Sequence, residues 1–238
     1  QFFLFSRFQI QRILKLVHYL PITMKQSYLK NKEIMITSIN QPNKNLKYTS
    51  IMVKKLIKIS EKKLDLILDI RYATKNNFTG RQIYNRDDCY LHPEAFERLT
   101  IAIEFAKKLG LKFKIFDGFR PSDSQKKLWN FYPNKNFISP PTKGSPHSRG
   151  IALDLTLIDK KGNDLDMGTE FDEFSTLSYH GTKYISKQAT NNRLLLLGIM
   201  TSSGWDFFRN EWWHYQLFKS KSFPIMNDNI LPEPLTKK

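Results

Sequence analysis

A histidine and an aspartate stand seven positions apart in the segment GSPHSRGIALDLTL, residues 144–157. His147 lies among Gly, Ser and Pro, which are typical of turns, whereas Asp154 interrupts a run of Ile, Leu and Thr typical of a buried strand. A carboxylate that is buried without a partner costs several kcal/mol or loses its charge. The sequence therefore predicts a partner for Asp154.

A second pair of polar residues, Glu211 and His214, opens the segment EWWHYQLF near the end of the chain. Imidazole nitrogens and carboxylates are common ligands of zinc, and a catalytic zinc usually has three protein ligands and one open position for water. His147, Asp154 and His214 would form such a set, which leaves Glu211 free to act on the water. The combination predicts one zinc ion per chain.

Each of these residues also has an ordinary structural explanation. A single histidine in a turn is more often a hydrogen-bonding residue than a metal ligand, Asp154 could pair with Arg149, and Glu211 and His214 could form an edge-strand pair. A regular strand would also point residues seven apart to opposite faces. Gly150 offers an irregular step between His147 and Asp154 that could bring them together.

The segments around these residues include both strand-like patterns, with apolar residues at every second position, and helix-like patterns. Leu64, Leu66, Leu68 and Ile70 alternate as in a half-buried strand. The remaining expected elements are a helix over 92–110 ending at Gly110, a strand over 111–117, a short helix opened by a capping box of Ser122 and Gln125, a helix near 191–204 and a strand over 212–218. Because helices and strands do not alternate regularly, we expect an α+β fold, a single domain with a mainly antiparallel sheet packed with helices.

The positive charge of the chain is unevenly distributed. The formal net charge is +16, yet residues 1–63 hold 13 of the 38 Lys and Arg and only two of the 22 acidic residues. We therefore expect a basic N-terminal extension over 1–63, a catalytic domain over 64–225 and a C-terminal tail over 226–238. The extension could be an amphipathic helix, a leader or sequence upstream of a start at Met24 or Met35.

Composition also narrows the class of protein. No run of 18 apolar residues is present, which predicts no transmembrane helix, and the lone Cys89 fits a cytoplasmic location, with the periplasm as the alternative. Since the basic excess lies mainly outside the expected domain and no recognition motif is visible, we expect no specific nucleic-acid partner.

Two motifs resemble those of the zinc D-Ala-D-Ala peptidases: SPHSRGIALD fits S-x-H-x-x-G-x-A-x-D, and EWWH fits E-x-W-H. The likeness is closer to the VanX-type D-alanyl-D-alanine dipeptidases, whose blocks are matched in order by five segments, RYATKNNFTG, CYLHPEAFERL, IFDGFRPSDSQ, MGTEFDEFS and EWWHY. Together they span about residues 64–218. Two departures are Pro146, between Ser145 and His147, and the lack of a counterpart for residues 1–63.

The resemblance implies a role for each matching residue. His147, Asp154 and His214 would bind zinc, Glu211 would be the base that activates the water on it, and Arg120 would stabilise the tetrahedral oxyanion. Ser145 and Tyr72 would contact the substrate carboxylate and Asp172 the ammonium group, and Asp117 is counted with the expected substrate-binding residues.

The implied reaction is hydrolysis of the small D-alanyl-D-alanine dipeptide to two D-alanines. The alternatives are a D,D-carboxypeptidase or endopeptidase acting on peptidoglycan peptides, and a non-catalytic zinc-binding module. The sequence does not indicate whether the protein is a monomer or an oligomer.

Overall fold

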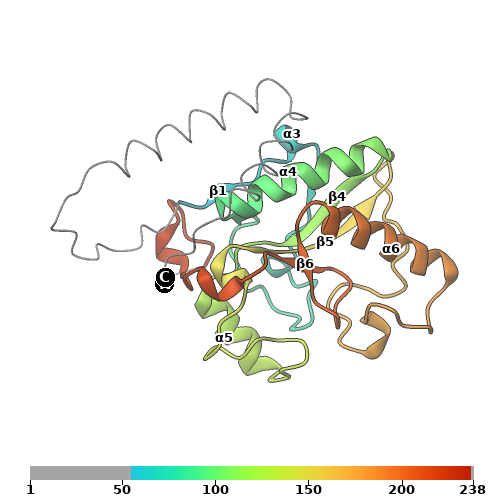
Figure 1. The fold of residues 1–238 in the computed structure, drawn as a ribbon. Helices are drawn as coiled ribbons and strands as arrows, with labels where there is room; N and C mark the ends of the chain where they lie inside the picture. Colours follow the sequence, from blue (N-terminus) through green and yellow to red (C-terminus); the bar gives the residue numbers. More distant parts are fainter. Residues whose placement is uncertain (1–54, 237–238) are drawn as a thin grey trace, which may run out of the picture. The chain divides into compact units, whose positions relative to one another are not determined.

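The computed structural model describes residues 55–236, and its central feature is a five-stranded sheet (Figure 1). The strand order is β2-β4-β5-β7-β6, in which β2 runs parallel to β4 and every other neighbouring pair is antiparallel. The strands are β2 (Ile67–Leu68), β4 (Lys112–Asp117), β5 (Ala152–Ile158), β6 (Asp206–Phe207) and β7 (His214–Gln216). This arrangement confirms the predicted α+β fold with a mainly antiparallel sheet.

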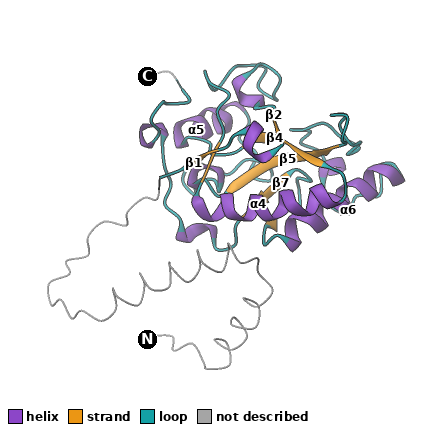
Figure 2. Cartoon of the chain, turned by 90° about the horizontal axis from the view of Figure 1, so that it is seen from above, coloured by secondary structure: helices purple, strands orange, loops and turns teal. Residues whose placement is uncertain are grey.

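Helices lie on both sides of the sheet. Helices α4 (Pro93–Lys108) and α6 (Lys187–Ser202) lie over one face, and α5 (Ser122–Phe131) lies on the other side of the sheet (Figures 1 and 2). All seven residues of the central strand β5 are buried. Asp154 is therefore held in the middle of the core, where its surroundings must satisfy its charge.

The helix expected over 92–110 is present as α4, which spans Pro93–Lys108 with His92 as its N-cap. Pro93 is its first residue, where a missing N–H costs nothing, and Leu99 and Ala106 are buried on its inner face. Gly110 adopts a left-handed φ of 72°, which ends the helix as predicted.

Two local expectations differ from the structure. The strand expected from Leu64 is shorter, because a helical turn, α3 (Glu61–Leu64), comes first and only β2 pairs with the sheet. The capping box of α5 does not form: Pro121 is the N-cap residue, with no side-chain hydrogen bond. Ser122 lies inside the helix, so the side chain of Gln125 is free to make other contacts.

The described fold extends beyond residues 64–225 at both ends. Before this range, β1 (Ile57–Lys58) pairs with β3 (Tyr90–Leu91). After it, Leu231 and Leu235 are buried, and the Asp228 carboxylate accepts hydrogen bonds from the backbone N–H groups of Leu235 and Thr236. Residues 226–236 are thus packed against the domain.

The expected features of residues 1–54 lie outside the described part of the chain. Within residues 55–236, no helix has both the length and the apolar character needed to cross a membrane.

Candidate metal centre and active site

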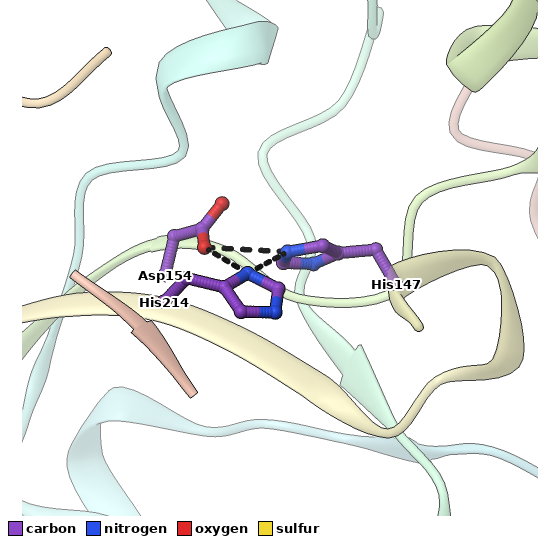
Figure 3. A group of neighbouring side chains, drawn as sticks. All are labelled: His147, Asp154 and His214. Carbon is purple, nitrogen blue, oxygen red and sulfur yellow. Dashed lines mark hydrogen bonds and ion pairs between the residues drawn. The ribbon is translucent and has the colours of Figure 1, made fainter. Parts of the chain in front are cut away.

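The three predicted metal ligands come together from two strands and a turn. Asp154 on β5 and His214 on β7 are direct partners across the sheet, so their side chains share a face. His147 lies in a 3₁₀ turn, His147–Arg149, which ends at Gly150 with a left-handed φ of 68°. This is the irregular step that the sequence suggested, and it turns His147 toward the other two residues (Figure 3).

The ligand atoms of the three side chains form a nearly equilateral triangle. His147 Nε2 lies 3.1 Å from His214 Nδ1 and 3.2 Å from Asp154 Oδ1, and the third side, His214 Nδ1 to Asp154 Oδ1, is 3.0 Å. Tetrahedral zinc with ligands at about 2.0–2.1 Å separates them by about 3.3–3.4 Å. The spacing therefore fits a small tetrahedral cation.

The outer nitrogen of each histidine indicates which atom faces the centre. His147 Nδ1 lies 2.8 Å from the Gly118 carbonyl oxygen, and His214 Nε2 lies 3.1 Å from the Gln216 side-chain oxygen. Both oxygens only accept, so in the neutral imidazoles these outer nitrogens carry the hydrogens. The two inner nitrogens then present lone pairs to each other and to a carboxylate, an arrangement that a bound cation stabilises.

The charge of Asp154 is stabilised by its neighbours. Burial alone would raise the pKa of this carboxyl group, but His147 and His214 together hold the pKa well below its ordinary value. Its second oxygen, Oδ2, accepts a hydrogen bond of 3.3 Å from Arg120 Nη2. Asp154 is thus the partnered buried carboxylate that the sequence required, and its partners do not include Arg149, which instead donates to the backbone oxygens of Lys143 and Phe223.

Glu211 lies beside the three candidate ligands but farther from them than they lie from one another. Its Oε2 is 4.0 Å from His214 Nδ1 and its residue is 6% exposed. Burial raises its pKa well above the ordinary value, the nearby charges of Asp154 and Asp172 add to the rise, and Arg120 opposes it. A carboxylate whose pKa is raised in this way is suited to take up and release a proton.

Arg120 is buried and held by three acceptors. Its Nε donates to Asp117 Oδ2 at 2.8 Å, its Nη1 to Gln125 Oε1 at 3.0 Å and its Nη2 to Asp154 Oδ2. Its guanidinium also lies 4.9 Å from the centre of the Tyr72 ring. Burial acts to lower the pKa of Arg120, but Asp117 and the other neighbours raise it well above its ordinary value, so the group stays charged.

Asp117 occupies a supporting position and not the expected substrate-binding one. It is 1% exposed, and both carboxylate oxygens accept hydrogen bonds from the protein, Oδ1 from the Tyr84 hydroxyl and Oδ2 from Arg120. Its Oδ2 also lies 3.7 Å from His147 Nδ1. The structure therefore places Asp117 behind Arg120 and His147, where it holds the Arg120 side chain by a hydrogen bond.

A cavity of about 220 Å³ opens onto these groups, and its lining includes the remaining predicted residues Ser145, Tyr72 and Asp172. This volume is below the roughly 300–1,000 Å³ typical of pockets for drug-sized ligands, so it suits a small substrate. Ser145 Oγ accepts a hydrogen bond from the His147 backbone N–H, which leaves its own hydrogen free for a ligand.

Tyr72 and Asp172 form a pair at the wall of the cavity. The Tyr72 hydroxyl lies 3.2 and 3.3 Å from the two oxygens of Asp172 and donates to that carboxylate. Since a hydroxyl has one hydrogen, Tyr72 has none left for a substrate carboxylate, which disfavours its expected role. Burial raises the pKa of Asp172 to about 8, so a cationic ligand would stabilise its ionised form.

Sequence reasoning missed four polar residues that line the cavity, Gln125, Lys135, Ser139 and Gln216. Gln125 was assigned to a helix cap, and Gln216 lies in an ordinary strand pattern. The two-residue spacing of His214 and Gln216 on one face of β7 could have indicated the Gln216 contact.

Comparison with known proteins agrees with this geometry. The sequence profile of peptidase family M15, described as D-ala-D-ala dipeptidase, matches residues 52–233. A D-alanyl-D-alanine dipeptidase of Escherichia coli is 41% identical over 166 residues, which cover 70% of this chain and 86% of that protein. Proteins with the same name from Enterococcus faecium and Enterococcus faecalis are 34% and 33% identical, each over 63% of this chain and 84% of its own length. The chain belongs to the D-Ala-D-Ala dipeptidases of peptidase family M15.

Proposed function

We propose that this enzyme hydrolyses free D-alanyl-D-alanine to two molecules of D-alanine. The observation that carries the proposal is the buried group of His147, Asp154 and His214, with Glu211 beside it, facing a small cavity that also contains Asp172. Family membership supports the substrate. The group supplies three metal ligands and, in Glu211, a carboxylate for proton transfer. Asp172 adds a carboxylate that can pair with the ammonium group of the dipeptide.

His147, Asp154 and His214 would hold a zinc ion. When bound, zinc supplies a Lewis acid that polarises the carbonyl and lowers the pKa of its water to about 7. The outer contacts of the two histidines, to Gly118 and Gln216, keep their inner nitrogens available as ligands.

Glu211 would act as general base and then as general acid. Its carboxylate accepts the proton of the attacking water and delivers it to the leaving amine. General acid–base catalysis by a positioned side chain is worth about 10²–10⁴-fold in rate. Burial and the charges of Asp154 and Asp172 raise its pKa, which makes the carboxylate a stronger proton acceptor.

Arg120 would stabilise the negative charge that develops on the carbonyl oxygen. Its five N–H groups include three donated to Asp117, Gln125 and Asp154, which leaves one on each terminal nitrogen for the substrate. Because the guanidinium is fixed before the substrate arrives, little reorganisation is needed as the charge forms.

The two ends of the dipeptide would be recognised by opposite chemistry. Asp172 would pair with the ammonium group, while the Ser145 hydroxyl would donate to the carboxylate. We propose that Tyr72 orients Asp172 and does not contact the carboxylate, since its hydrogen is donated to Asp172.

The runner-up is a D,D-carboxypeptidase or endopeptidase, whose substrate continues beyond the ammonium end. Asp172 at the cavity wall favours the dipeptidase. Measuring D-alanine release from D-Ala-D-Ala and from a cell-wall pentapeptide ending in D-Ala-D-Ala tests the choice. We expect turnover of the dipeptide and little of the pentapeptide; the reverse preference would identify the carboxypeptidase. Release from neither would favour the non-catalytic zinc-binding module.

A further inference from the structure

Gln125 connects the catalytic arginine to the loop that forms one wall of the cavity. It lies in the first turns of α5 and is 2% exposed. Its Oε1 accepts from Arg120 Nη1 at 3.0 Å, and its Nε2 donates to the Ser139 carbonyl oxygen at 2.8 Å. Ser139 belongs to the segment 132–146, several residues of which line the cavity.

The chemistry of these contacts fixes the orientation of the amide. Arg120 has only donors and a backbone carbonyl only accepts, so the oxygen must face Arg120 and the nitrogen must face Ser139. If the amide were turned over, its NH₂ group would face the N–H groups of Arg120, and its oxygen would face the Ser139 carbonyl oxygen. The glutamine amide carries its acceptor and its donor on separate atoms, which matches these two contacts.

We propose that Gln125 is a positioning residue that holds Arg120 in its catalytic orientation and couples that orientation to the loop 132–146. The inference rests on the proposed function and deepens it. Of the three acceptors of Arg120, Gln125 is the only uncharged one and the only one anchored to the loop. Because Gln125 Oε1 accepts one hydrogen of Arg120 Nη1, only the other hydrogen of Nη1 can be donated to the substrate.

The loop has a second anchor in the same region. Asn210 Nδ2 donates to the Asn136 carbonyl oxygen at 2.9 Å, and the Phe137 ring stacks on Phe174 with centroids 5.0 Å apart. Both Phe137 and Phe174 line the cavity. The loop is therefore held at Asn136, Phe137 and Ser139, and also at Lys143, whose backbone oxygen accepts from Arg149. Of these contacts, the one at Ser139 leads through Gln125 to Arg120.

Two substitutions separate the two contacts of Gln125. Gln125→Met removes both, whereas Gln125→Glu keeps an acceptor for Arg120 and loses the donor for Ser139. We expect Gln125→Met to lower kcat for D-Ala-D-Ala by about 10- to 100-fold, the loss expected for a hydrogen bond to a charged group. Gln125→Glu should keep kcat within about threefold of the parent and raise KM, because the loop is released while Arg120 stays held.

A double-mutant cycle with Arg120→Lys decides whether Gln125 acts through Arg120. If it does, adding Gln125→Met to Arg120→Lys should change kcat by no more than about twofold. An equal loss of kcat in both backgrounds would overturn the proposal. Asn192→Leu is the matched control: Asn192 is a buried amide whose nitrogen donates to the Asp166 carbonyl oxygen away from the cavity, and its loss should leave kcat unchanged.

Failure of the proposed function would be distinguishable from failure of this inference. If the parent protein releases no D-alanine from D-Ala-D-Ala, the proposed function is wrong, and a crystal structure of Gln125→Met then decides the inference. Displacement of Arg120 Nη2 from Asp154 Oδ2 would support the positioning role. An unmoved guanidinium would overturn it.

Discussion

Asp172→Asn should remove most of the preference for a free ammonium group. The pKa of Asp172 is raised to about 8, first by burial and then by the charge of Asp154. With that pKa, about a tenth of the enzyme carries an ionised Asp172 at pH 7 and about a hundredth at pH 6. A dipeptide with a free ammonium group needs the ionised form, whereas an N-acetylated dipeptide is accepted by the neutral form.

The ratio of kcat/KM for D-Ala-D-Ala to that for N-acetyl-D-Ala-D-Ala should therefore rise about tenfold per pH unit from about pH 6 to 7.5. Above about pH 8 the ammonium group of the substrate loses its own proton and the rise ends. The ratio at pH 7.5 should therefore be about 30 times the ratio at pH 6.

The assay measures D-alanine release from both substrates across this pH range. Ionisations of Glu211 and of the metal site affect both substrates, so they largely cancel in the ratio. Asp172→Asn should make the ratio small and independent of pH. A ratio that is flat in the parent protein, or that rises equally in Asp172→Asn, would refute the reasoning.

Three other substitutions have defined outcomes. Glu211→Gln should keep the metal, measured by elemental analysis, and lose about 10²–10⁴-fold in kcat, because the amide cannot accept the proton of the water; loss of the metal would instead make Glu211 a ligand. Asp117→Asn should lower the free energy of unfolding by about 3 kcal/mol in urea titrations, because Arg120 loses a buried counter-charge; an unchanged midpoint would contradict this. Gly118→Ala should cost about 1–3 kcal/mol, since a Cβ there would lie 2.5 Å from Cys89 Sγ. Adding Cys89→Ala should recover part of that loss, and no recovery would assign the cost elsewhere.

The sequence was sufficient to predict the fold class and the side chains that meet at the centre. Turn residues, an apolar strand and a carboxylate that required a partner made His147, Asp154 and His214 candidate ligands, and the resemblance to the zinc D-Ala-D-Ala peptidases selected them over the ordinary structural explanations. The left-handed Gly150 then supplied the step that a regular strand could not. Each candidate was recognised from its immediate sequence neighbours, although His214 lies 60 positions from Asp154.

The supporting contacts could not be predicted, because they join residues far apart in the chain. Tyr72 reaches Asp172 across 100 positions, and Gln125 reaches Ser139 across 14. The local pattern at Gln125 even indicated another role, a capping box, which tertiary contacts replaced. The packing of residues 226–236 likewise depends on Asp228 and a few buried leucines, with no periodicity to indicate it.

Metal reconstitution tests the central claim most directly. Protein stripped of metal with a chelator is titrated with zinc while D-alanine release from D-Ala-D-Ala is measured, in parallel with His214→Ala. We predict no activity without metal and a linear rise that ends at about one zinc per chain, as one complete set of three ligands requires. His214→Ala should show no such rise. Full activity after metal removal, or the same zinc-dependent rise in His214→Ala, would contradict the account.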